Sequence, residues 1–201
     1  MAKELPIGFT AEMVKARQEG RKTVTRRVIK PQPEVFDNAG YPDYVCLKHR
    51  YQVGDLLWLK ESYCHGIEWD DCKPSEVDPL CGGNDIWYFA DGERPTEGWG
   101  KKRSSRFMPK WVARTWLEVV SVRPERVQDI TDEDAIKEGI RTVQLPNKVT
   151  LYHISTWPDP MAADTPRGAF RNLWDSINGK RGYLWASNPW VWRIEFKEYP
   201  K

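Results

Sequence analysis

The chain has 201 residues, of which 40% are hydrophobic and 30% charged, so it can form a packed core and is not disordered as a whole. Its 31 basic and 29 acidic residues leave a net charge of only +2, which excludes a uniformly basic surface and requires any nucleic-acid-binding surface to be local. The sequence contains no apolar run long enough to span a membrane and no apolar signal region at its start, so we expect a cytoplasmic protein.

The first part of the chain predicts two strands that flank a short helix. Residues 5–9 (LPIGF) favour a strand, and Thr10 can cap a following helix, which should end at Gly20. Residues 23–29 (TVTRRVI) are rich in β-branched side chains, which favour a second strand over a helix. Prolines and a glycine indicate a loop over residues 30–50.

The middle of the chain predicts two longer strands separated by an insertion. After a turn at residues 53–55, the segment 56–63 (LLWLKESY) favours a strand. Residues 64–105 are rich in Gly, Pro, Asp and Glu, and only residues 85–90 (DIWYFA) within them are patterned as a strand. We interpret this segment as an insertion. Residues 111–127 then predict a long and well-buried strand.

The last part of the chain predicts two capped helices and a final strand. Residues 131–139 fit a short helix, residues 141–164 lack clear periodicity, and residues 165–179 fit a longer helix with one apolar face. Residues 190–196 (WVWRIEF) alternate, which predicts a strand with one buried face. Together these elements predict an α+β fold over residues 1–201, with a mixed sheet or small barrel and packed helices.

The stretch GRKTVTRR at residues 20–27 fits the pattern Gly-x-Lys-x-x-Thr-x-Arg. Because a predicted strand and helix precede it, the stretch resembles the signature of the activating-signal-cointegrator homology (ASCH) family. The ordered segments that follow strengthen the resemblance, namely VGDLLWLKESY, RFMPKWVARTWLEVVSVRPERVQDITDEDAIKEGI, the last helix and WVWRIEF. The chain is similar to the longer, phage- and prophage-associated branch of that family.

This resemblance implies a pseudouridine-synthase/archaeosine-transglycosylase-like (PUA-like) small β-barrel flanked by helices, which binds RNA or modified nucleosides in a cleft. Some short bacterial members are amidohydrolases that remove the acetyl group of N4-acetylcytidine, and the matching Lys22 and Thr25 would be catalytic, assisted by a glutamate near the last helix. At the aligned position this chain has Gly168, and the nearest acids, Asp164 and Asp175, do not match it.

The basic motif also predicts a geometry from its residues alone. Side chains alternate along a strand, so Thr25 and Arg27 should share one face, with Arg26 on the other and Lys22 at the preceding turn. For Lys22 to act as a base near neutral pH, burial or neighbouring arginines would have to lower its pKa by roughly 3 units. Thr25 needs such a base to become a nucleophile. The alternative interpretation is a solvated basic strand edge.

Glu61 follows a predicted strand and is the carboxylate that we expect to replace the missing glutamate. It can serve as an acid or base, or accept a hydrogen bond from the amino group of a nucleobase. The alternative interpretation is an ordinary exposed charge at the end of a strand.

The run from residue 101 to residue 114 interleaves cations with aromatic side chains, which suits a phosphate backbone with unpaired, stacked bases. Within it we predict ligand-binding roles for Arg106, Lys110, Trp111 and Arg114, in addition to Arg26 and Arg27 of the motif. The alternative interpretation is a solvated loop ahead of a strand whose tryptophan belongs to the core.

Four cysteines, Cys46, Cys64, Cys72 and Cys81, lie near His49 and His65 and provide enough ligands for a zinc site. However, the sequence contains no Cys-x-x-Cys pair, and the adjacent Cys64 and His65 would point apart in a strand. We therefore predict reduced cysteines, and neither a metal nor a cofactor.

Three functions follow from these features. The first is an ASCH-like protein that binds RNA or a modified nucleoside in a cleft lined by Lys22, Thr25, Arg27, Glu61 and Arg114. The second is an amidohydrolase on an N4-acylated cytidine-type nucleoside, or a ribonuclease, that uses Lys22 and Thr25. The third is a non-catalytic phage accessory protein that binds an unidentified protein partner through tryptophan-rich surface.

Overall fold

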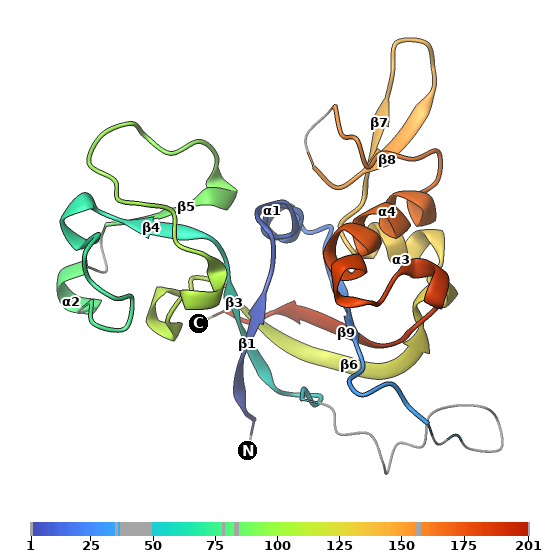
Figure 1. The fold of residues 1–201 in the computed structure, drawn as a ribbon, viewed down its shortest axis with the longest axis horizontal. Coiled ribbons are helices and arrows are strands. Elements are labelled where there is room, and N and C mark those ends of the chain that lie inside the picture. Colours follow the sequence, from blue (N-terminus) through green and yellow to red (C-terminus); the bar gives the residue numbers. More distant parts are fainter. Residues whose placement is uncertain are drawn as a thin grey trace. The chain divides into compact units, whose positions relative to one another are not determined.

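The computed structural model describes residues 2–34, 36, 50–77, 79–82, 85–155 and 158–200 (Figure 1). The chain divides into two compact units, which we call unit 1 and unit 2. Unit 1 consists of Met1–Lys15, Asp55–Glu118 and Glu198–Lys201, and unit 2 consists of Ala16–Gly54 and Val119–Lys197. The prediction of a single domain with an insertion stays a prediction.

The described strands include a mixed five-stranded sheet of order β1-β3-β6-β9-β2. Strand β1 (Glu4–Gly8) pairs in parallel with β3 (Leu56–Lys60), which pairs antiparallel with β6 (Trp116–Arg126). Strand β2 (Val24–Val28) pairs antiparallel with β9 (Trp190–Glu198). The predicted α+β class, with a mixed sheet and packed helices, is therefore confirmed.

Within unit 1, the segment between β3 and β6 forms a small hairpin and several short helical turns. Strand β4 (Tyr63–His65) pairs antiparallel with β5 (Ile86–Tyr88), and a short helix α2 (Pro79–Gly82) lies between them in the chain. Tyr63, Met108 and Val112 are buried together and form a local core. Within the segment interpreted as an insertion, Ile86 and Tyr88 pack against this core, whose buried residues flank the segment.

Three of the predicted strands in unit 1 are shorter than the sequence indicated. The strand predicted over residues 56–63 ends at Lys60, and the strand predicted over residues 85–90 ends at Tyr88. The strand predicted over residues 111–127 begins only at Trp116 because Lys110–Val112 form a 3₁₀ turn after Pro109. Proline has no N–H for a strand ladder, and its fixed φ favours such a turn.

Within unit 2, two helices lie side by side (Figure 1). Helix α3 (Asp132–Lys137) begins at Thr131, whose side chain accepts a hydrogen bond from the N–H of Asp134. Helix α4 (Pro166–Asn178) begins at Thr165, whose hydroxyl accepts from the N–H of Gly168. Both caps are those that the sequence predicts.

Two features of unit 2 differ from the predictions. Strand β7 (Arg141–Gln144) and strand β8 (Thr150–His153) form an antiparallel hairpin in a segment without clear periodicity. Strand β9 is buried on both faces over most of its length, so Arg193 is only 6% exposed and the expectation of one buried face is wrong. Buried ion pairs, described below, explain why a charged residue occupies this position.

Helix α1 (Ala11–Gln18) ends as predicted, with Gly20 at a φ of 76°. This left-handed conformation is strained for residues with a side chain but not for glycine. It returns the chain toward the helix, so that the N–H groups of Arg21 and Lys22 both donate to the carbonyl of Ala16. The turn thereby fixes the start of the basic motif.

The helices in the described part of the chain are all too short or too polar to cross a membrane.

Candidate functional site

The basic motif of unit 2 packs against the C-terminal end of α3. The N–H of Thr23 donates to the carbonyl of Lys137, which fixes the strand start against the helix end. Gly139 follows the helix at a φ of 110°, and a Cβ atom there would lie 2.9 Å from the Cβ of Ala16. Because a side chain at this position would clash with Ala16, glycine allows the chain after α3 to pass close to the end of α1.

Lys22 is fully buried and its ammonium group makes three hydrogen bonds. Nζ donates to the carbonyl oxygens of Val24 and Glu138, both at 2.9 Å, and to Oε2 of Glu138 at 2.7 Å. Burial lowers the pKa of Lys22 from its ordinary value, the carboxylate of Glu138 opposes that change, and Arg27 and Arg26 add to it. The ammonium group of Lys22 is therefore buried in direct contact with a carboxylate.

Arg26 joins the same carboxylate to two further acids. Its guanidinium donates to Glu125 at 2.7 Å, to Asp134 at 2.6 Å and to Oε1 of Glu138 at 3.2 Å. Arg193 also donates to both oxygens of Asp134, at 2.9 and 3.1 Å. We call these six residues the unit 2 charge cluster: Lys22, Arg26, Glu125, Asp134, Glu138 and Arg193. The cluster pairs three cations with three carboxylates.

Thr25 and Arg27 lie on the opposite face of β2 from Arg26, as strand alternation predicts. Thr25 is 3% exposed and is opposite Ile194 of β9, and Arg27 is opposite Trp192. Burial lowers the pKa of Arg27, and the charge of Arg27 in turn helps to lower the pKa of Lys22. The pKa of Lys22 thus depends in part on Arg27, which shares one face of β2 with Thr25.

A second charged group, in unit 1, surrounds Glu61. The Glu61 carboxylate is 1% exposed and accepts two hydrogen bonds from Arg114, at 2.9 and 3.0 Å. Arg114 also donates twice to Asp91, at 2.6 and 2.7 Å, and lies 3.9 Å from the centre of the Tyr88 ring. Burial raises the pKa of Glu61, and the hydrogen bonds from Arg114 oppose that rise. Arg114 is therefore held by two carboxylates.

The other residues predicted to bind a ligand within residues 101–114 each have a different environment. Arg106 is exposed, Lys110 forms an ion pair with Glu4, and Trp111 is half-buried and stacked on His65 with 5.8 Å between ring centres. Lys22 and Thr25 belong to unit 2, whereas Glu61 and Arg114 belong to unit 1. The predicted cleft that combines them stays a prediction.

Sequence reasoning missed Glu138, Asp134 and Arg193. Asp134 and Glu138 are spaced i, i+4 on the predicted helix, and this spacing places two acids on one helical face. This spacing is a local signal for an acidic pair, and the capping and termination of the helix do not depend on it. Arg193 was assigned to the exposed face of an alternating strand, so nothing suggested that it would be buried beside an acid.

Only some of the cysteine and histidine residues considered as zinc ligands lie within the described residues. Cys64 and Cys72 are free thiols, whereas Cys46 and His49 lie outside the described residues. Within the part of the chain that the structure describes, no three His, Cys, Asp or Glu side chains are grouped to hold a metal ion.

The charge cluster predicts a specific pH dependence for Asp134→Asn. Hydrogen bonds from Arg193 and Arg26 hold the pKa of Asp134 well below its ordinary value. The folded state therefore gains stability from the ionised carboxylate above about pH 4, and loses it as pH falls toward the lowered pKa. In urea unfolding, Asp134→Asn should be less stable than the unaltered protein at pH 7, and the difference should shrink near about pH 3.

The exposed control Glu12→Gln should change stability by less than about 0.5 kcal/mol at either pH. A stability difference for Asp134→Asn that is the same at both pH values would contradict the assigned ion pairs.

The comparisons with known proteins give one distant likeness. The sequence matches no protein-family model and no curated protein. The structure is similar to the crystal structure of an ASCH domain from Lactobacillus crispatus JV V101, with a TM-score of 0.41 and 12% sequence identity. The similarity covers 98% of this chain and 79% of that chain. A likeness at this level assigns no activity.

Proposed function

We propose that unit 2 hydrolyses the amide bond of an N4-acylated cytidine-type nucleoside, with Lys22, Thr25 and Glu138 as its reactive groups. The observation that carries this proposal is the buried contact of 2.7 Å between Nζ of Lys22 and Oε2 of Glu138. This contact places a lysine whose pKa is lowered by burial within hydrogen-bond distance of a carboxylate, which is the geometry that general acid–base catalysis requires. The motif that resembles the ASCH signature supplies the substrate class.

In this proposal, neutral Lys22 accepts the proton of the Thr25 hydroxyl, and Thr25 Oγ1 attacks the acyl carbon. Lys22 passes this proton to Oε2 of Glu138, which it contacts at 2.7 Å, and Glu138 gives it to the departing exocyclic amine as the C–N bond breaks. Water hydrolyses the resulting ester and restores the threonine, so the products are a carboxylic acid and the free cytidine-type amine. Threonine needs an adjacent base for such a step, and burial of Lys22 favours its neutral form.

In this proposal Glu138 takes the role of the carboxylate that the sequence does not have at Gly168. It follows α3 rather than lying in α4, and both of its oxygens face cations, Lys22 on one and Arg26 on the other. A hydrolase of this type needs a carboxylate near the motif lysine, and the contact of 2.7 Å between Glu138 and Lys22 supports this assignment. Asp175, by contrast, accepts a hydrogen bond from the N–H of Trp185 at 2.6 Å and has a structural role.

A second candidate is binding of the same nucleoside, or of RNA, without turnover. The observation that favours it is that Lys22 is fully buried and already has three acceptors for its ammonium group. A lysine in this state stabilises the fold and shapes the surface of β2 without taking part in chemistry. In that case Thr25 and Arg27 would only contact the ligand.

The experiment that separates the two candidates measures deacylation of N4-acetylcytidine and its binding in parallel. We expect the unaltered protein to release cytidine, Thr25→Ser to retain part of the rate, and Thr25→Val to lose about 100-fold or more. Thr25→Val has the same shape without the hydroxyl, so binding should change little.

Binding without turnover in the unaltered protein would overturn the hydrolase and leave the second candidate. Equal rates in Thr25→Val and the unaltered protein would remove Thr25 from the mechanism. If neither binding nor turnover is detected, the nucleoside is the wrong ligand, and the predicted protein partner becomes the stronger interpretation.

A further inference from the structure

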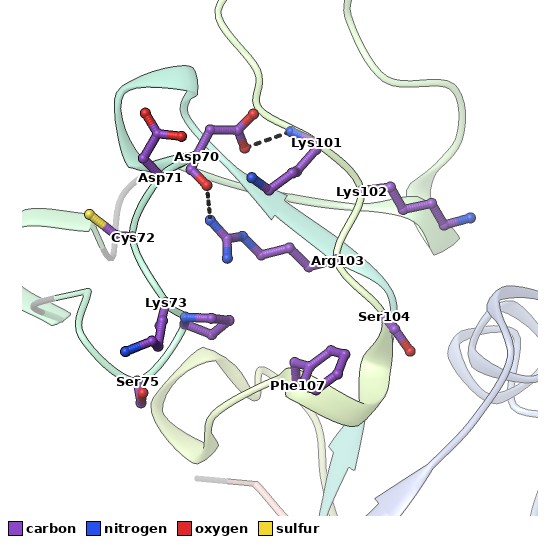
Figure 2. A pocket seen from close by; sticks show the side chains of 11 residues that line it. Asp70, Asp71, Cys72, Lys73, Ser75, Lys101, Lys102, Arg103, Ser104 and Phe107 are labelled. Carbon is purple, nitrogen blue, oxygen red and sulfur yellow. Dashed lines mark hydrogen bonds between the residues drawn. The ribbon is translucent and has the colours of Figure 1, made fainter.

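Unit 1 contains a pocket that the proposed function does not use. Its volume is about 840 Å³, and Figure 2 shows its lining side chains arranged around one opening. Its lining includes the cationic side chains of Arg103 and Lys101 and one aromatic side chain, that of Phe107. The pocket is large enough for a ligand of nucleotide size.

Arg103 lies across this pocket and is anchored by its own backbone. Its N–H and C=O both bond to Tyr63, at 2.8 and 3.2 Å, so the side chain starts from a fixed position. The guanidinium donates through Nη2 to the carbonyls of Trp69 and Asp70, at 2.7 and 3.2 Å. Figure 2 shows the guanidinium pointing into the ring of lining residues.

The charge of Arg103 is not neutralised by a carboxylate of the described residues. Its hydrogen bonds go to neutral carbonyls, and its Nε is buried without a hydrogen-bond partner in that part of the chain. The residue is only 8% exposed. A largely buried guanidinium whose hydrogen bonds go to neutral carbonyls keeps an uncompensated positive charge, which favours an anionic ligand in the pocket.

The rim of the pocket adds further positive charge. Lys101 and Lys102 are exposed and follow one another in the chain, and Lys102 lies 4.6 Å above the Phe89 ring. Lys73 forms an ion pair with Glu76 at 2.9 Å and therefore contributes less. The lining also contains Asp70, one oxygen of which accepts from the N–H of Lys101 at 2.7 Å, and the exposed Asp71.

An aromatic side chain stands at the same opening. Phe107 is 62% exposed although it is a large apolar residue, and Figure 2 shows its ring at the edge of the pocket. An exposed ring next to cations provides a stacking surface for an unpaired base. An inorganic anion would contact the cationic side chains but would not stack on the Phe107 ring.

We propose that this pocket binds a nucleotide, with the phosphate at Arg103 and Lys101 and the base stacked on Phe107. The ligand is either a free mononucleotide or one residue of a single-stranded RNA, because both present a phosphate beside a flat ring. The inference concerns other residues than the proposed hydrolase and does not depend on it.

The test measures binding to the full chain at low salt with four probes: cytidine, CMP, inorganic phosphate and a fluorescein-labelled ten-residue oligouridylate. CMP or the oligouridylate should bind at least about tenfold more tightly than cytidine and than inorganic phosphate. Binding of CMP indicates a free nucleotide, and binding of the oligouridylate alone indicates an RNA strand. For the strand, three or four phosphate contacts give a log–log salt slope of about 2 to 3 in magnitude.

Lys101→Met and Phe107→Leu should each weaken binding about fivefold or more, because they remove a phosphate contact and a stacking surface. Both side chains are exposed, so these variants should fold, whereas loss of Arg103 would also free two carbonyls. Lys3→Met, which removes an exposed charge of unit 1 outside the pocket lining, should bind as the unaltered protein does.

Three outcomes overturn the proposal. One is the absence of binding by both CMP and the oligouridylate, and another is equal affinity for inorganic phosphate and CMP. The third is nucleotide binding that survives unchanged in both Lys101→Met and Phe107→Leu. None of these measurements requires deacylation, so a negative result would not contradict the proposed hydrolase activity of unit 2.

Discussion

Lys22→Met should lower the free energy of unfolding by about 3 to 5 kcal/mol, because it leaves the buried Glu138 carboxylate without its nearest cation. Arg26 still holds the other oxygen of that carboxylate at 3.2 Å, so we expect the lower end of this range. The carbonyls of Val24 and Glu138 also lose their shared donor. Urea unfolding monitored by tryptophan fluorescence measures the change.

A double-mutant cycle separates the pair from the rest of the cluster. Lys22→Met combined with Glu138→Leu removes both charges, so it should recover part of the loss because no buried charge then remains unpaired. Lys137→Met removes an exposed lysine next to Glu138 and should change stability by less than about 0.5 kcal/mol. Additive effects of the two single changes would contradict a direct Lys22–Glu138 interaction.

Trp174→Ala should destabilise the protein by about 3 to 5 kcal/mol, as expected for a large buried aromatic residue. Trp174 is 3% exposed on the inner face of α4, its ring centre lies 6.2 Å from that of Phe170, and its Nε1 donates to the carbonyl of Tyr183 at 2.8 Å. The substitution therefore removes apolar contacts and leaves a carbonyl without a donor. Thermal or urea unfolding measures the loss.

A matched control is Trp185→Ala, since Trp185 also lies against Phe170 but is only half-buried. Its loss should be clearly smaller than that of Trp174→Ala because less apolar area returns to water. Similar losses for the two variants would show that burial on α4 does not determine the stability of this region.

The elements that the sequence predicted well are those with a local signal. Caps at Thr131 and Thr165 and the left-handed Gly20 depend on neighbouring residues, and all three are found where predicted. The hairpin over residues 141–153 was missed because its strands are only half-buried and their polar and apolar residues mix. Pairing across a turn, rather than periodicity, determines those strands.

The candidate site was only partly predictable. The motif indicated Lys22, but its partner Glu138 is 116 residues away in the chain, and such a contact has no local signature. Arg114 was interpreted as a ligand-binding cation, whereas the structure gives it Glu61 and Asp91 as partners. Sequence patterns therefore located the charges but not which charges neutralise one another.

The most direct test of the proposed chemistry is the single-turnover rate of Glu138→Gln with N4-acetylcytidine, measured with binding of the same compound. Glutamine keeps the shape and an oxygen acceptor for Lys22 but cannot supply the proton to the departing amine. We predict a rate reduced by about 100-fold or more, with affinity within about threefold of the unaltered protein. A folded Glu138→Gln variant that deacylates at the unaltered rate would contradict the account.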